Sequence, residues 1–334
     1  MTAHAAAILG VSGTVLTAEE AAFLREADPW GFILFARNVS RPGQLRVLFA
    51  SLREAVGRNA PILIDQEGGR VQRMRAPYWR EFLPALDQMA RAKRPIRAQW
   101  VRNRIIAHEL NQMGIDVNAA PLADLVEDDT HRVLRNRLYG SDIETVIEAA
   151  RTCADAFLSG GVLPILKHIP GYGRAHVDSH LDVPRVRASR EALAARDFAP
   201  FRGLRDIKMG MTAHIVMEAI DPDRPATVSP DVMDVIRTEI GFDGLMMTDD
   251  ISMEALSGSV AERSAAAIAA GCDIVLHSNG KLPEMEAVIA ASGNLSDNGQ
   301  ARAEAALAER RAPEPVDIDA LDAELAALLD GRDG

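Results

Sequence analysis

The chain has 334 residues, which exceeds one typical domain of ~150 residues but suits a single α/β barrel of roughly 250 residues with additions. Hydrophobic residues make up 48% and charged residues 25%, values that exclude disordered, collagen-like and low-complexity proteins. Acidic residues outnumber basic ones 48 to 37, giving a net charge of -11. With no concentrated basic face, we expect neither nucleic acid nor an anionic membrane as a partner.

The beginning of the chain and its cysteines bear on the cellular compartment. The N-terminal apolar run has no positively charged region before it, and no stretch reaches ~18 apolar residues, so we expect a soluble, cytoplasmic protein. Cys153 and Cys272 lie in separate apolar segments without CxxC spacing. This pattern predicts two buried thiols rather than a disulfide or a zinc site.

Eight short apolar segments recur along the chain with amphipathic segments between them, which is typical of repeated βα units. The apolar segments are 5–11, 31–36, 61–65, 115–122, 162–168, 209–216, 244–250 and 272–278. The clearest helical patterns are 17–28, 98–114, 141–161 and 229–241, several of which open with Ser, Thr or Asp as a cap.

These units predict an α/β fold, specifically a single (β/α)8 barrel of the TIM type over residues 5–293. The alternative, a doubly wound open sheet, usually has fewer strands and a GxGxxG segment after the first strand, which is missing here. The alanine-rich, charged segment 294–334 has no strand pattern and is predicted to form one or two surface helices. We therefore expect residues 1–334 to form one domain without a second, and a monomer.

In such barrels the reactive groups lie at the carboxyl ends of the strands, where the loops converge on one pocket. Charged groups that follow apolar strands are costly to bury unless they are paired or used. The polar residues at these positions are Asp65, Asp124, Lys167, His168, His214, Asp249, Asp250 and His277.

Three segments carry a resemblance to a known family: IDQEGGRVQR (64–73), KHIPGYGRAHVDSH (167–180) and GFDGLMMTDDISMEAL (241–256). Together they resemble glycoside hydrolase family 3, in particular its bacterial cytoplasmic β-N-acetylglucosaminidase branch, and the similarity extends over most of residues 5–290. The resemblance implies a retaining exo-β-N-acetylglucosaminidase that needs no metal or organic cofactor. It also implies a small saccharide or muropeptide substrate from peptidoglycan recycling.

The resemblance also implies the catalytic groups. Asp249, the first acid of the TDD motif, corresponds to the nucleophile, while either acid of the pair could instead cap the following helix, a role that suits Asp250 better. Asp178 and His180 of the DSH motif correspond to the acid/base pair, in which the carboxylate orients the imidazole and favours its protonated form. His176 has the wrong spacing for this motif and is expected to be a bystander.

By the same resemblance, Asp65, Arg73, Arg137, Lys167 and His168 bind the sugar hydroxyls. Simple surface ion pairs are the alternative for the two arginines. The segment departs from the branch at Tyr172, where histidine is common, and at Ile169, where phenylalanine is common. We expect both departures to affect closure of the catalytic loop or the preference for the leaving group, rather than the type of reaction.

Several features have plain interpretations. The acids and histidine of EDDTH (127–131) are expected to be solvated rather than to bind a metal, and His214 either lines the pocket or caps the core. Gly68 and Gly69 allow a tight turn near the ligand. Two other functions stay open: a β-glucosidase or β-xylosidase of the same family, and a sugar-binding barrel that has lost catalysis.

Overall fold

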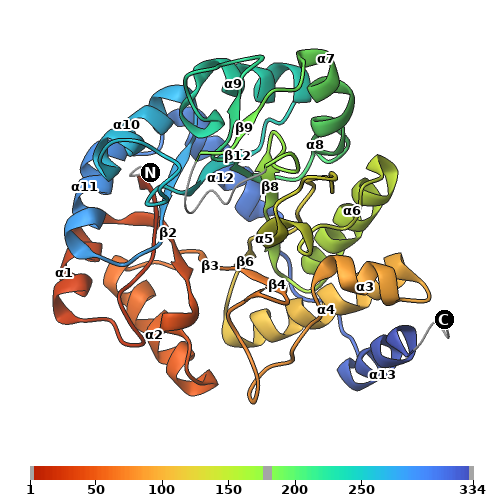
Figure 1. Ribbon diagram of the computed structural model, residues 1–334. Helices are drawn as coiled ribbons and strands as arrows, with labels where there is room; N and C mark the ends of the chain where they lie inside the picture. The colour runs from red at the N-terminus through yellow and green to blue at the C-terminus, as the bar shows by residue number, and fades with distance from the viewer. Residues whose placement is uncertain (1–3, 176–182, 331–334) are drawn as a thin grey trace.

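The computed structural model describes residues 4–175 and 183–330, which form a ring of helices around a central barrel of strands (Figure 1). The strands of the barrel are β1 (Ala5–Leu9), β2 (Pro29–Leu34), β3 (Ile62–Ile64), β6 (Val117–Asn118), β7 (Leu163–Pro164), β8 (Leu166–Ile169), β10 (Met209–Thr212), β12 (Leu245–Asp250) and β13 (Ile274–His277). Every pairing between them is parallel.

The sheet closes through β7 and β8, which are separated only by Ile165 and act as one bent strand. β7 pairs with β6, and β8 pairs with β10 on the other side. The amide of Ile165 continues the ladder by donating to the carbonyl of Asn118 at 3.1 Å. The described residues thus contain eight barrel positions in chain order, so the predicted barrel is confirmed and the open sheet is wrong.

Successive strand residues alternate between the barrel interior and the surrounding helix layer. In β1, Ala6 and Ile8 belong to the interior cluster, whereas Ala7 and Leu9 pack against the helices. Both faces of each strand are therefore buried, which explains why the strands appear in the sequence as continuous apolar runs.

Several of the helices between the strands begin at the caps expected from the sequence. Thr17 and Glu20 form a reciprocal capping box at the start of α1, and Asp142 and Ser229 cap α6 and α9. The α-helices are α1 (Ala18–Ala27), α2 (Pro42–Val56), α3 (Ala85–Arg91), α4 (Pro95–Met113), α5 (Arg132–Arg135), α6 (Ile143–Ser159), α7 (Arg190–Ala192), α8 (Ala199–Gly203), α9 (Pro230–Val235), α10 (Val260–Ala270), α11 (Leu282–Ser292), α12 (Asp297–Ala308) and α13 (Ile318–Leu329). Short 3-10 or π turns occupy η1 (Ala36–Asn38), η2 (Leu193–Asp197), η3 (Ala226–Val228) and η4 (Ile236–Ile240).

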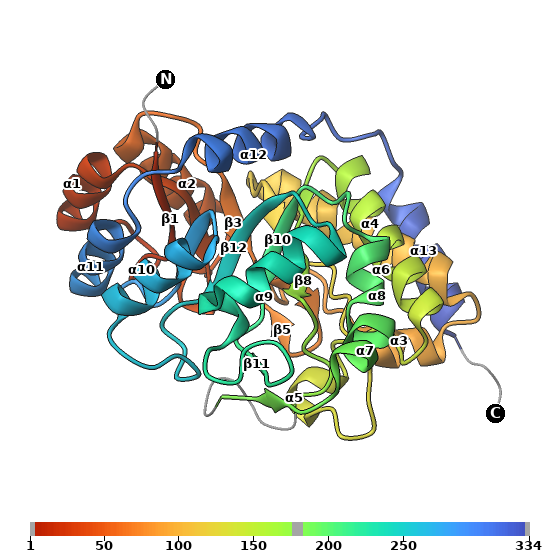
Figure 2. The same cartoon turned by 90° about the horizontal axis from the view of Figure 1, so that it is seen from above.

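The C-terminal segment forms the two predicted helices, α12 and α13, but α12 is more than a surface helix. Ala303 and Ala306 of α12 are buried in the interior cluster of the barrel. Figure 2 shows α12 at one end of the barrel, opposite the loops that carry β5 (Val71–Gln72), β11 (Val216–Met217) and α5. It therefore seals the amino-terminal end of the strands and leaves the other end for the pocket.

α13 packs along α4, where Arg97 makes two hydrogen bonds of 2.7 Å to the carboxylate of Glu324. Both cysteines are free and buried, as predicted. Among the described residues, no helix is both long and apolar enough to span a membrane.

Candidate active site

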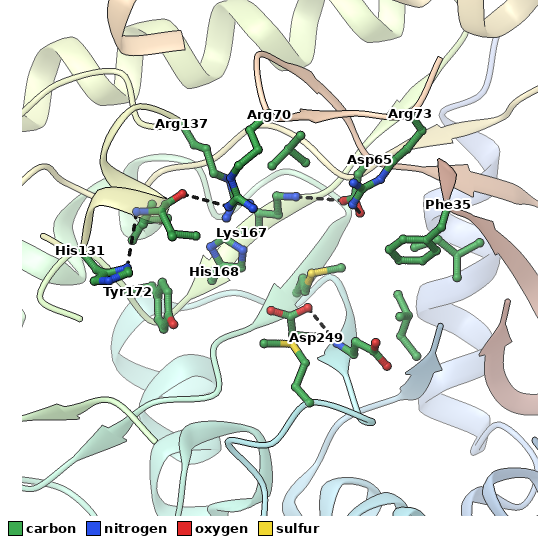
Figure 3. Close-up of a pocket in the computed structure, with 18 residues that line it drawn as sticks. Phe35, Asp65, Arg70, Arg73, His131, Arg137, Lys167, His168, Tyr172 and Asp249 are labelled. Atoms are coloured by element: carbon green, nitrogen blue, oxygen red, sulfur yellow. Dashed lines mark hydrogen bonds and ion pairs between the residues drawn. The ribbon is translucent and has the colours of Figure 1, made fainter. Parts of the chain in front are cut away.

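A pocket of about 330 Å³ opens at the carboxyl end of the barrel. All five residues expected to bind the sugar line it, together with the expected nucleophile: Asp65, Arg73, Arg137, Lys167, His168 and Asp249. Figure 3 shows these side chains converging on the pocket from different strands and loops. The structure thus brings together residues that are far apart in the sequence.

One wall of the pocket is a continuous network of ion pairs. Asp65 accepts hydrogen bonds from Arg73 Nη2 at 2.9 Å and from Lys167 Nζ at 3.2 Å. Lys167 also lies 2.6 Å from Glu67 Oε1. Glu67 in turn accepts two hydrogen bonds from Arg137, at 2.8 and 2.9 Å. The two arginines are therefore not simple surface pairs, since Arg73 and Arg137 both belong to this partly or wholly buried network.

The network fixes the charge of its carboxylates. Burial alone would raise the pKa of Glu67, but Arg137 and Lys167 more than offset it and lower that pKa to about 2. The pKa of Asp65 also lies well below its usual value, because Lys167 and Arg73 outweigh the effect of burial. Burial would likewise lower the pKa of Arg137, which Glu67 and Asp65 instead raise. All three groups are therefore ionised at neutral pH.

Replacing Lys167 by Met should lower the free energy of unfolding at pH 7 by about 3–5 kcal/mol, because two buried carboxylates would lose their shared cation. Glu67 contributes stability fully above its ordinary pKa of 4.5, and this contribution is lost as the pH falls from 4.5 towards about 2. The difference between Lys167→Met and wild type should therefore shrink over that range. Urea unfolding at several pH values measures it, and a difference independent of pH would contradict the assignment.

His168 is held by a buried carboxylate behind it. Its Nδ1 lies 2.8 Å from Asp124 Oδ2, so its Nε2 is the ring nitrogen left for the pocket. Asp124 also accepts a hydrogen bond of 2.7 Å from the amide of Tyr172, whose ring lies 5.5 Å from the His168 ring. Tyr172, one of the two departures from the family pattern, thus lines the pocket. Ile169, the other, is buried in the core and does not.

Asp249 and Asp250 end β12, and their side chains differ in role. One Asp249 oxygen accepts a hydrogen bond of 2.8 Å from the amide of Asp250. The Asp250 carboxylate accepts from the amides of Ser252 and Ser278, at 3.1 and 3.2 Å, and from the Ser278 hydroxyl. Asp250 is therefore occupied in fastening two loops, although part of it also lines the pocket. It does not cap the following helix as predicted, because α10 is capped by Ser259.

The Asp249 carboxylate is ionised at neutral pH. Burial alone would raise the pKa of Asp249, but the neighbouring His214 and His168 imidazoles, the Asp250 amide and Lys167 lower it below its usual value. An ionised carboxylate that lines a pocket can attack an electrophilic carbon.

His214 supports this end of the barrel from the core. Its Nε2 donates to the carbonyl of Asp250 at 2.9 Å, and its Nδ1 lies 2.7 Å from the hydroxyl of Thr227. Burial lowers the pKa of His214. Of the two roles left open by the sequence, His214 therefore has the core role.

Sequence reasoning missed several residues of the pocket and its support. Phe35 lines the pocket, and the guanidinium carbons of Arg37 and Arg73 lie 5.4 and 4.9 Å from the centroid of its ring. Arg70 and His131 also line the pocket. Glu67 lies in the motif IDQEGGRVQR (64–73), but no function was predicted for it from the sequence. The charged residues near it in this motif were the only indication that it belongs to the site.

The predicted acid/base pair, Asp178 and His180, and the bystander His176 lie outside the described residues, so their roles stay predictions. The EDDTH segment (127–131) is a structural loop. Glu127 pairs with Arg196, and Thr130 donates to the carbonyl of Gly173 at 2.6 Å. In the part of the chain that the structure describes, no cluster of three or more potential ligands could hold a metal ion.

Comparisons with known proteins agree with this geometry. Residues 7–310 match the glycosyl hydrolase family 3 N terminal domain. The β-hexosaminidase of Alkalilimnicola ehrlichii is 37% identical over 300 residues, covering 87% of this chain and 84% of the relative. The chain therefore belongs to glycoside hydrolase family 3.

Solved structures extend the comparison to the fold. NagZ from Neisseria gonorrhoeae, in complex with N-trifluoroacetyl-D-glucosamine, has a TM-score of 0.85 and 29% identity over 98% of this chain and 99% of that one. A family 3 β-N-acetylglucosaminidase from Paenibacillus sp. has a TM-score of 0.86 and 28% identity, with this chain covering 66% of its length.

Proposed function

We propose that this protein is a retaining exo-β-N-acetylglucosaminidase that removes terminal β-linked N-acetylglucosamine. Its substrates would be fragments such as N-acetylglucosaminyl-anhydro-N-acetylmuramyl species, in cytoplasmic peptidoglycan recycling, and it would act as a monomer. The observation that carries the proposal is the ionised Asp249 in one pocket with the Asp65–Lys167–Arg137 wall. The similarity to β-hexosaminidases and to a family 3 β-N-acetylglucosaminidase supports the choice of sugar.

In the proposed first step, an Asp249 oxygen attacks the anomeric carbon while the imidazolium of His180 protonates the departing glycosidic oxygen. The bond to the leaving alcohol breaks as the glycosyl–aspartate bond forms, and inversion at the carbon gives a covalent intermediate. In the second step the neutral imidazole takes a proton from water, whose oxygen displaces Asp249 with a second inversion. These steps use only carboxylate and imidazole groups, so neither needs a metal or an organic cofactor.

Recognition of the sugar would use the network on the pocket wall. Lys167, Arg137 and Arg73 can donate hydrogen bonds to ring hydroxyls, and Asp65 can accept them. A substrate lacking a hydroxyl would leave one of these groups unpaired, which gives strong discrimination between sugars. The pocket, closed at its floor by the barrel interior, suits one terminal residue of a chain.

A panel of β-linked nitrophenyl glycosides tests the sugar assignment. We expect kcat/KM for N-acetylglucosamine to exceed that for glucose and xylose by about 100-fold or more, because both lack the 2-acetamido group and would leave the polar groups that bind it unpaired. N-acetylgalactosamine is the matched control, because it keeps the acetamido group and differs only in the configuration of one ring hydroxyl. Faster cleavage of glucose or xylose would favour the β-glucosidase or β-xylosidase alternative, and binding without cleavage would favour a sugar-binding barrel.

A further inference from the structure

Glu67 lies directly behind two groups that face the pocket. Its carboxylate contacts Lys167 and Arg137, both of which line the pocket, but Glu67 itself is not among the lining residues. Its side chain is only 6% exposed. It can therefore act on a bound sugar only through the two cations that it holds.

The position of the Glu67 backbone is fixed independently of these cations. The guanidinium of the buried Arg102 donates to the carbonyl of Glu67. The next residue, Gly68, has a φ of +104°, and a Cβ at that position would overlap Arg102. The neighbouring amide of Gln66 donates to Asn118 Oδ1 at 2.9 Å. The carboxylate is thus presented from a firmly held backbone in β4 (Gln66–Gly68), a short strand that follows β3 and pairs with β5.

Charge gives Glu67 a second effect on the same groups. Without it, the network would hold Arg73, Arg137 and Lys167 against the single carboxylate of Asp65. Arg137 would lose both of its hydrogen bonds to a carboxylate, since its Nε and Nη2 are both bonded to Glu67. Long cationic side chains lose considerable rotamer entropy when they are ordered, so a partner that orders them beforehand strengthens later binding.

We propose that Glu67 is a positioning residue, which holds Lys167 and Arg137 in the orientation that binds the sugar in the transition state. The role rests on the proposed function, in that it assumes a glycoside bound at these two cations. Nothing in it requires Glu67 to touch the substrate or to exchange a proton.

A double-mutant cycle between Glu67→Gln and Arg137→Gln tests this role, with rates normalised to active sites by a slow fluoro-sugar. Glu67→Gln should lower kcat/KM by about 10- to 100-fold and raise KM. Adding Glu67→Gln to Arg137→Gln should lower kcat/KM by a smaller factor than Glu67→Gln does in wild type, because Glu67 then has only Lys167 left to position. Glu81→Gln, which removes an exposed carboxylate paired with Arg75, is the matched control and should match wild type.

A purely structural role would reduce the amount of active enzyme and leave KM per active site unchanged. The proposal would be overturned if kcat/KM of Glu67→Gln were within twofold of wild type. It would also be overturned if the fold-losses in kcat/KM of the two single variants simply multiplied in the double variant. Should Glu67→Gln not fold, Glu67→Asp takes its place in the cycle. It keeps the charge with a shorter reach, and the same non-additivity is expected of it.

The cycle is kept distinct from the assignment of the sugar. It is run on whichever glycoside the wild-type protein cleaves fastest in the panel. A preference for glucose would therefore contradict the proposed function but leave the Glu67 test intact, whereas additive losses on N-acetylglucosamine would contradict only the role of Glu67.

Discussion

Replacing Asp249 by Asn should lower turnover by about 1000-fold or more, while the protein stays folded. The amide is nearly isosteric and can keep the hydrogen bond from the Asp250 amide, but it is a poor nucleophile for the anomeric carbon. The lowered pKa of Asp249 means that wild type already has the carboxylate ionised at neutral pH. Steady-state kinetics on nitrophenyl N-acetylglucosaminide, with circular dichroism to check the fold, measures the effect.

Asp250→Asn provides the comparison within the same motif. Asp250 bonds to the amides of Ser252 and Ser278, so its replacement should mainly lower the melting temperature. If Asp250→Asn lost as much turnover as Asp249→Asn, or if Asp249→Asn stayed active, the assignment of the nucleophile would be wrong.

Replacing His180 by Ala should separate good leaving groups from poor ones. A disaccharide needs protonation of the glycosidic oxygen, whereas nitrophenolate departs readily without it. We expect the variant to lose about 100- to 10,000-fold on the disaccharide, and far less in the glycosylation step on the nitrophenyl substrate. Single-turnover measurements isolate this step from water attack, in which we expect the same imidazole to act as the base.

Asp178→Ala should act as a milder form of the same change, because it removes the orienting carboxylate but leaves the imidazole. Equal losses on both leaving groups in His180→Ala would place the acid elsewhere. His176→Ala is the next variant to measure in that case.

The barrel is predictable from the sequence because its strands are short apolar runs and its helices have clear caps. Segment 17–28 contains the whole capping box of α1, from Thr17 to Glu20. The closure of the sheet at Ile165 is not predictable in this way, because it depends on which strands become neighbours after folding. The burial of Ala303 and Ala306 at the end of the barrel could not be predicted from the sequence either, because alanine is equally common in exposed helices.

The pocket was predictable where a charged residue directly follows an apolar strand, as for Asp65 and Asp249. The supporting carboxylates were harder to find, because a partner far along the chain decides whether a buried acid is stable. Glu67 bonds to Arg137, 70 residues later, and Asp124 bonds to His168, 44 residues later. Local spacing carries no information on such pairs.

The most direct test of the account is to trap the covalent intermediate. Wild-type protein is incubated with a slow fluorinated N-acetylglucosamine derivative that carries a good leaving group, then digested and examined by mass spectrometry. We expect the mass of one sugar on the peptide that contains β12, with fragmentation placing it on Asp249. A label on another acidic residue, or rapid hydrolysis to the α-anomer with no label at any time, would contradict a retaining mechanism through Asp249.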